Sequence, residues 1–229
     1  MNLLALDTST EVMAIAVCRG DLVLQHQAPG GAQASAALIP AIGQLLAQAG
    51  LELRGLDAIV FGRGPGSFTG LRTACAVAQG LAFGAQLPVL PVDTLLAVAE
   101  DARARAGATR LVAMLDARMD QVYAAAYEWS GDQWQRHGDI VLQAPQQVAV
   151  PPGWALAGNV FAAYGPRLPA GERIEALPAA GALLRLAPAL LAAGQAVPAA
   201  AALPLYIRDS VAQTTAERAA ARAAAPPRP

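Results

Sequence analysis

Three polar stretches contain the residues that could do chemistry in this chain of 229 residues. The first is Asp7, followed by the hydroxyl residues Thr8, Ser9 and Thr10. An aspartate beside hydroxyl groups could hold a metal-bound nucleotide or direct hydroxyls at a phosphate. The same residues could instead form an Asx or Ser/Thr turn that closes a hairpin. The sequence leaves both interpretations open.

The second stretch is the glycine-rich segment at residues 62–70, GRGPGSFTG. Glycines allow close backbone approach, and the helix that follows has free N–H groups at its start, so Gly66 and Ser67 are candidate ligand contacts. The segment lacks the G-x-G-x-x-G register, the P-loop lysine and the G-x-S-x-G nucleophile elbow. Anion contact and a purely structural turn between strand and helix both remain open.

The third stretch repeats the first, with Asp116, Arg118 and Asp120 after another apolar run. Arg118 could clamp an anionic ligand or pair with a neighbouring carboxylate. A second acidic turn at the end of a second strand indicates that the chain is built from two related halves.

Composition excludes several classes of function. All 16 basic residues are arginine, which rules out a Walker A lysine and Schiff-base catalysis, and the net charge of −1 gives no broad basic field for binding nucleic acid alone. The two cysteines and two histidines lack metal-ligand spacing, so we expect buried, reduced cysteines and surface histidines (His26 and His137) in loops or at strand ends. The start has no basic leader and no long apolar run follows, which predicts a cytoplasmic protein without a membrane span.

Paired apolar runs predict how these turns are positioned. Residues 3–6 and 12–17 flank the first turn as a hairpin, and residues 111–115 and 122–127 flank the third. The two aspartates lie about 109 residues apart, close to half the chain. We therefore expect two α/β lobes at 1–108 and 109–215, with a loosely ordered tail at 216–229.

Strand and helix signals alternate between the hairpins. Residues 56–61, 87–92 and 154–157 have the composition of buried strands, and helices are expected from a cap at Ser35, from a cap at Asp93 or Thr94, and over 180–193. The helix at 71–83 carries a single charge, Arg72, and has no clear solvent face. Such a helix must be covered on nearly every side, by this chain or by a partner.

Four motifs in this order closely resemble the bacterial TsaB (YeaZ) family. They are LALDTST at 4–10, GRGPGSFTGLR at 62–72, LDARMDQVY at 115–123 and YIR at 206–208. The resemblance covers nearly the whole chain before the tail. It implies a duplicated actin-like α/β fold, related to sugar kinases and ribonuclease H, with two lobes of mixed sheets flanked by helices. It also implies a role in making threonylcarbamoyladenosine beside the anticodon of tRNA.

In that family the chain is a non-catalytic relative of the transferase subunit TsaD, with which it pairs, and TsaE is the associated ATPase. The transferase holds its metal through an H-x-x-x-H pair, which this chain lacks. The resemblance therefore implies no catalytic or metal-binding residue here, no cofactor bound by this chain alone, and contact with tRNA through the complex. It leaves open ATP or ADP at the subunit junction, and a homodimer when the partner is absent.

The resemblance also implies that the first two long helices form the partner interface. The residues expected there are Leu38, Ile39, Ile42, Leu45, Leu46, Leu71, Ala74, Val77, Ala78 and Leu81. Asp7, Thr8, Ser9, Gly66, Ser67 and Arg118 are the candidate nucleotide or ligand contacts. The competing hypothesis is a stand-alone enzyme of the same fold, either an ATP-dependent phosphotransferase or a glycoprotease-like hydrolase.

Overall fold

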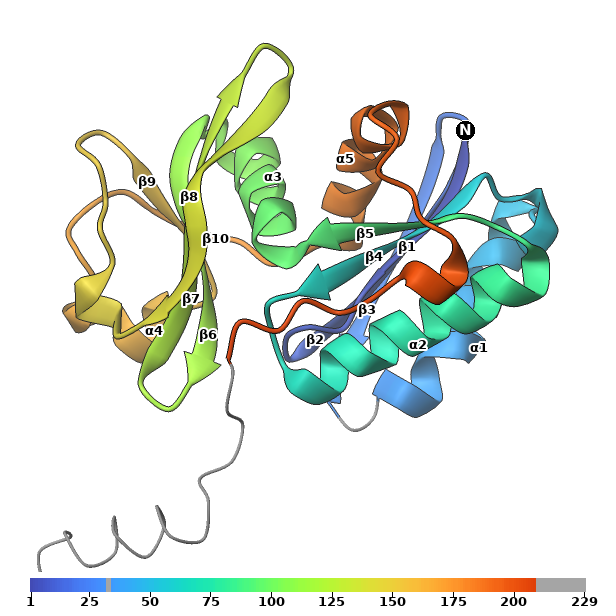
Figure 1. Cartoon of the computed structure of the whole chain (residues 1–229), viewed down its shortest axis with the longest axis horizontal. Coiled ribbons are helices and arrows are strands. Elements are labelled where there is room, and N and C mark those ends of the chain that lie inside the picture. The colour runs from blue at the N-terminus through green and yellow to red at the C-terminus, as the bar shows by residue number, and fades with distance from the viewer. Residues whose placement is uncertain (32–33, 209–229) are drawn as a thin grey trace, which may run out of the picture.

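A computed structural model describes residues 1–31 and 34–208, which form two β-sheets and the helices packed on them (Figure 1). The predicted tail at 216–229 lies outside the described residues. None of the described helices is long and apolar enough to span a bilayer.

The described part of the first half of the chain contributes the first sheet and four helices. The strands are β1 (Asn2–Asp7), β2 (Val12–Arg19), β3 (Leu22–Pro29), β4 (Ala58–Gly64) and β5 (Val89–Asp93). The helices are α1 (Ala34–Ala49), the short η2 (Leu53–Gly55), α2 (Phe68–Ala85) and α3 (Thr94–Ala106).

The second half contributes the second sheet. Its strands are β6 (Arg110–Arg118), β7 (Gln121–Ser130), β8 (Gln133–Gln143), β9 (Ala155–Gly158) and β10 (Arg173–Glu175). Its helices are η3 (Pro145–Gln147), α4 (Phe161–Tyr164), η4 (Gly165–Arg167), α5 (Ala180–Ala192) and η5 (Ala199–Ala201).

The two sheets have the same topology, which confirms the predicted duplication. The strand orders are β3-β2-β1-β4-β5 and β8-β7-β6-β9-β10. In each sheet the first three strands of the repeat are antiparallel and the last two join in parallel. Asp7 and Asp116 therefore lie near the ends of equivalent central strands.

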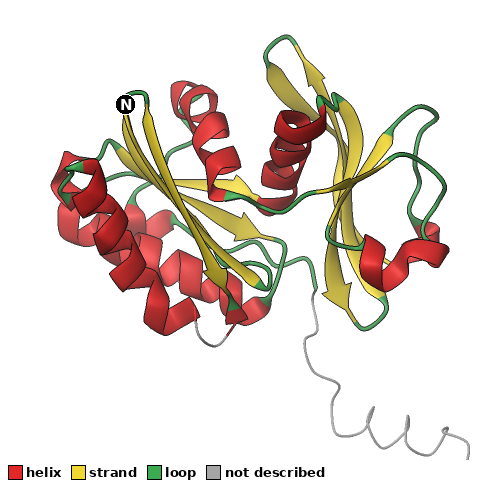
Figure 2. Cartoon of the chain, turned by 180° about the vertical axis from the view of Figure 1, so that it is seen from behind, coloured by secondary structure: helices red, strands yellow, loops and turns green. Residues whose placement is uncertain are grey.

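The helices form layers around the two sheets (Figures 1 and 2). Helices α1 and α2 bury their apolar stripes on one face of the first sheet, and α5 covers its other face. Helix α3 packs on the second sheet and against α5. The strands of the first sheet end at Asp93 and those of the second begin at Arg110. Helix α5, from the second half of the chain, nevertheless packs on the first sheet.

Local sequence accounts for most helix boundaries. Helix α1 begins at Ala34, one residue before the predicted cap, and Gly50 follows its end with a φ of +62°. Helix α3 begins after Asp93, but that side chain makes no capping hydrogen bond. Its carboxylate instead accepts from Arg63 at 2.7 Å and from Arg136 at 2.9 Å.

The halves differ most in the helices that cover their outer faces. Where the first half has the long α1 between its third and fourth strands, the second has only η3. Where the first half has α2, the second has the four-residue α4 and the short η4. Among residues 1–31 and 34–208, the long outer helix pair therefore belongs to the N-terminal lobe alone.

The edge strands β3 and β8 carry the two histidines. His26 lies within β3 and His137 within β8, both exposed to solvent. Surface exposure is as predicted, but their placement in loops or at strand ends is wrong. Edge strands need few apolar residues, so polar composition there does not exclude a strand.

Candidate functional site

Asp7 is a completely buried acid at the end of β1. Its Oδ1 accepts hydrogen bonds from the Ser9 N–H at 2.8 Å and the Ser9 hydroxyl at 2.6 Å. Its Oδ2 has no hydrogen-bond partner in the described part of the chain. Burial outweighs the bonds from Ser9 and raises the pKa of Asp7 from 3.8 to about 7. The residue is the acid of a closed turn rather than an exposed ligand.

The glycine-rich segment packs directly on this turn. A Cβ added at Gly62 would overlap the Asp7 carboxylate, and one added at Gly66 would come 2.6 Å from the Cβ of Ser9. The Ser67 N–H donates to the Ser9 carbonyl at 2.8 Å. The close approach predicted from these glycines is thus made to the chain's own backbone, which favours the structural interpretation of the segment.

Thr8 and Gly70 complete the packing at the start of α2. The Thr8 hydroxyl donates to the Gly70 carbonyl at 2.6 Å, and a Cβ on Gly70 would overlap the Thr8 carbonyl oxygen. The Thr8 hydroxyl proton is thus used within the chain and is not free to donate to a ligand.

Two glycines of helix α2 give a matched test of this packing. We expect Gly70→Ala to lower the free energy of unfolding by about 2–3 kcal/mol, because the added methyl meets rigid backbone. Gly80→Ala should raise it by about 0.5–1 kcal/mol, because a Cβ at Gly80 meets nothing within 4 Å and alanine favours a helix. Urea denaturation of both variants measures the difference. Equal stability of the two variants would contradict the packing described.

A cavity of about 430 Å³ lies between the lobes, lined by both halves of the chain. Of the six predicted ligand contacts, four line it: Ser9, Gly66, Ser67 and Arg118. Asp7 and Thr8 do not line it, because both are buried beneath the glycine-rich segment. Its lining otherwise combines apolar side chains such as Leu71 and Leu115 with polar ones.

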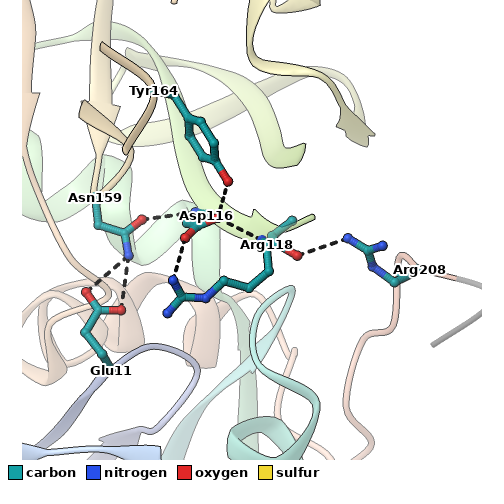
Figure 3. A network of polar contacts seen from close by, with 7 residues as sticks. Glu11, Asp116, Arg118, Asn159, Tyr164 and Arg208 are labelled. Carbon is teal, nitrogen blue, oxygen red and sulfur yellow. Dashed lines mark hydrogen bonds and ion pairs between the residues drawn. The ribbon is translucent and has the colours of Figure 1, made fainter. Parts of the chain in front are cut away.

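Polar residues at the cavity rim form a connected network (Figure 3). Asp116 accepts from the Tyr164 hydroxyl at 2.8 Å and pairs with the Arg118 guanidinium at 3.0 Å. The Asn159 side chain accepts from the Asp116 N–H at 3.1 Å and contacts the Glu11 carboxylate across the lobes at 3.4 Å. Burial and the bond to Asp116 raise the pKa of Tyr164 to about 12, so it donates as a neutral phenol. Of the two roles predicted for Arg118, the structure contains the pairing with a carboxylate.

The predicted partner residues fall into two groups. Seven are buried in the chain's own core and are not available on its surface: Leu38, Ile42, Leu45, Leu46, Leu71, Ala74 and Ala78. Six of them pack in the core beneath the first sheet, on the inner stripe of α1 or α2. The seventh, Leu71, lines the cavity between the lobes. Ile39 is 54% exposed, whereas Val77 and Leu81 are partly buried. The surface available to a partner is therefore narrower than the sequence predicts.

One large aromatic residue of α2 is exposed near these positions. Phe83, near the end of α2, is 78% exposed. The same side of the helix carries Ala76, Gly80 and Gly84, four residues apart and exposed. A Cβ at either glycine would meet nothing within 4 Å. The outer face of α2 thus combines small residues that permit close approach with a large apolar side chain at one end.

The described residues do not assemble a familiar catalytic centre. No cluster of three or more His, Cys, Asp or Glu suited to a metal occurs among residues 1–31 and 34–208. Ser67 lines the cavity between the lobes, whereas His26 and His137 do not. Cys75 is buried, which raises the pKa of its thiol, and it donates to the Ala202 carbonyl at 3.3 Å.

Comparison with known proteins identifies the family. The family model described as "TsaD: tRNA N6-adenosine threonylcarbamoyltransferase" matches residues 25–225. The Escherichia coli tRNA threonylcarbamoyladenosine biosynthesis protein TsaB is 36% identical over 225 residues, covering 93% of this chain and 96% of that protein. The chain belongs to the TsaB (YeaZ) family. The Haemophilus influenzae TsaB is 46% identical over 124 residues, covering 54% of this chain and 52% of its own.

A solved TsaB-family structure confirms the fold. YeaZ from Pseudomonas aeruginosa superposes with a TM-score of 0.84 at 41% identity, covering 90% of this chain and 99% of that chain. The predicted duplicated actin-like fold, with two mixed sheets flanked by helices, is therefore confirmed. Within this TsaB-family chain, sequence reasoning missed Asn159 and Tyr164 as partners of Asp116, because they lie 43 and 48 positions away along the chain.

Proposed function

We propose that this chain is a non-catalytic subunit of the machinery that makes threonylcarbamoyladenosine on tRNA. Family membership supports this pathway, since the relatives at 36% and 46% identity are named for threonylcarbamoyladenosine biosynthesis. In this proposal the chain acts in the cytoplasm with a TsaD-type transferase subunit and a TsaE-type ATPase, and meets tRNA through that complex.

The observation that carries the proposal is the uncovered outer face of α1 and α2. In the part of the chain that the structure describes, long outer helices occur only in the N-terminal lobe. Their exposed side holds Ile39, Phe83 and a run of small residues. Exposed apolar residues beside positions that permit close helix approach are typical of a helix-packed interface. We infer that this outer face, defined by Ile39, Ala76, Gly80, Phe83 and Gly84, binds the transferase subunit. Two copies of the chain pair through it when that subunit is absent.

A subunit that works through this face would stabilise an active conformation of the transferase and supply no reacting group. The complete burial of Asp7 supports this role, because its carboxylate is bonded to Ser9 of the same turn. The competing function, a stand-alone phosphotransferase or hydrolase, is favoured only by the cavity between the lobes, where ATP or ADP could bind in the complex.

An assay in which single components are left out distinguishes the accessory subunit from the stand-alone enzyme. Transfer of the threonylcarbamoyl group to tRNA is measured with the transferase and ATPase subunits, with and without this chain, and with this chain alone. We expect product only in the complete mixture, at least about 100-fold above either incomplete one. Turnover by the chain alone, or full activity without it, would contradict the proposal.

A further inference from the structure

The last described segment, residues 202–208, crosses from one lobe to the other without joining either sheet. It begins on α2, where the Ala202 carbonyl accepts from the Gln79 side chain at 2.7 Å. The Leu205 N–H then donates to the Arg63 carbonyl at 2.7 Å. A Cβ at Gly64 would lie 2.5 Å from the Leu205 carbonyl oxygen, so the segment is seated closely on β4.

Tyr206 attaches the segment to the first turns of α2. Its ring lies 5.4 Å from that of Phe68, centre to centre, and its hydroxyl accepts from Arg72 Nε at 3.1 Å. The Arg72 guanidinium also lies 3.9 Å from the centre of the Phe68 ring. Three side chains therefore hold one another, and two of them belong to α2.

Arg208 attaches the other end of the segment to the opposite lobe (Figure 3). Its guanidinium donates to the Ala117 carbonyl at 3.0 Å and contacts the Met119 sulfur at 3.4 Å. Both acceptors belong to the turn that joins β6 and β7 at the rim of the cavity.

That turn is strained. Arg118, Met119 and Asp120 have φ values of +60°, +55° and +57°, a conformation that residues other than glycine adopt at a cost. Besides Arg208, Arg167 contacts this turn and pairs with Asp120 at 2.9 Å. A strained turn held from two sides responds to the loss of either contact.

We propose that residues 202–208 are a strap that couples the outer face of α2 to the β6–β7 turn across the cavity. Tyr206 is the contact on α2, Arg208 the contact on the turn, and the backbone between them transmits the restraint. The regulatory part rests on the proposed function: a partner docked on α2 orders Phe68 and Arg72, and so tightens the turn at the cavity mouth.

Amide hydrogen exchange of the isolated chain tests the strap itself. We expect Arg208→Ala to speed exchange of residues 117–120 about tenfold. Tyr206→Ala, which removes a contact on α2 only, should speed exchange of the same turn by a similar factor. Arg110→Ala is the matched control at the opposite end of β6, and should leave the turn unchanged. A purely local role for Tyr206 would alter exchange in α2 and the strap alone, and that result would overturn the proposal.

Tyr206→Phe keeps the ring and loses only the bond to Arg72, so it covers the case in which the alanine variant is poorly folded. We expect an intermediate increase in exchange at the turn, and no increase would count against the coupling. Adding the transferase subunit should slow exchange of the turn in the wild type and by a smaller factor in Tyr206→Phe. If the subunit does not bind at all, the proposed function is wrong. Hydrogen exchange of the isolated chain still tests whether residues 202–208 couple α2 to the β6–β7 turn.

Discussion

Gly80→Trp is expected to weaken binding of the transferase subunit by about 100-fold, which corresponds to about 3 kcal/mol. An indole at the middle of the small-residue run would prevent close approach of a partner helix. The chain itself should tolerate the change, because a Cβ at this position meets nothing within 4 Å. Isothermal titration calorimetry measures the affinity, and the melting temperature should stay within about 2 °C of the wild type.

Ala189→Trp is the matched control for this prediction. Ala189 is exposed on α5, which covers the opposite face of the same sheet. Binding should be unchanged in this variant, since the added indole lies away from α1 and α2. Equal loss of binding in both variants, or in neither, would show that the outer face of α2 is not the interface.

The second large effect is a pH dependence of stability that originates at Asp7. The folded chain binds the Asp7 proton more tightly than the unfolded chain, because the pKa is about 7 in the fold and 3.8 in the ordinary state. The stabilisation is therefore complete below about pH 4, is lost as the pH rises through about 7, and is absent above that. The shift corresponds to about 4 kcal/mol at most.

Asp7→Asn should remove this dependence. Its side-chain oxygen can still accept both bonds from Ser9, while no charge forms in the buried turn. We compare the free energy of unfolding of the variant with that of the wild type at each pH. This difference should be about 2–4 kcal/mol more favourable to the variant at pH 8 than at pH 5. Urea denaturation at the two pH values gives the comparison, and Asp21→Asn, at an exposed aspartate, is the control. The same difference between Asp7→Asn and wild type at pH 5 and pH 8 would contradict the assigned pKa.

Much of the fold follows from local patterns. The two hairpins are readable because their apolar runs are continuous and their turns begin with aspartate, and α1 because its apolar spacing ends at Gly50. The edge strands β3 and β8 cannot be recognised in this way, because each exposes most of its side chains. Packing of α5 on the other half's sheet is a contact between distant residues, which no local pattern encodes.

The candidate site is harder to predict because it depends on direction. Glycine spacing in 62–70 indicates close approach, but only the structure identifies the Asp7 turn as the neighbour. In α1 and α2 nearly every residue is apolar or small, so the sequence cannot distinguish the buried Leu38 from the exposed Ile39. The strap is invisible in sequence for the same reason, since Tyr206 and Phe68 are 138 positions apart.

The most direct test of the central claim is tRNA modification in the complete mixture with the wild-type chain replaced by its variants. At subunit concentrations near the wild-type dissociation constant, we predict that Gly80→Trp gives less than about 5% of wild-type product while Ala189→Trp gives full activity. Raising the concentration of Gly80→Trp about 100-fold should restore product. The variant has lost affinity for the transferase subunit but has lost no catalytic group. Full activity of Gly80→Trp at the lower concentration would contradict the claim that this chain acts through the outer face of α1 and α2.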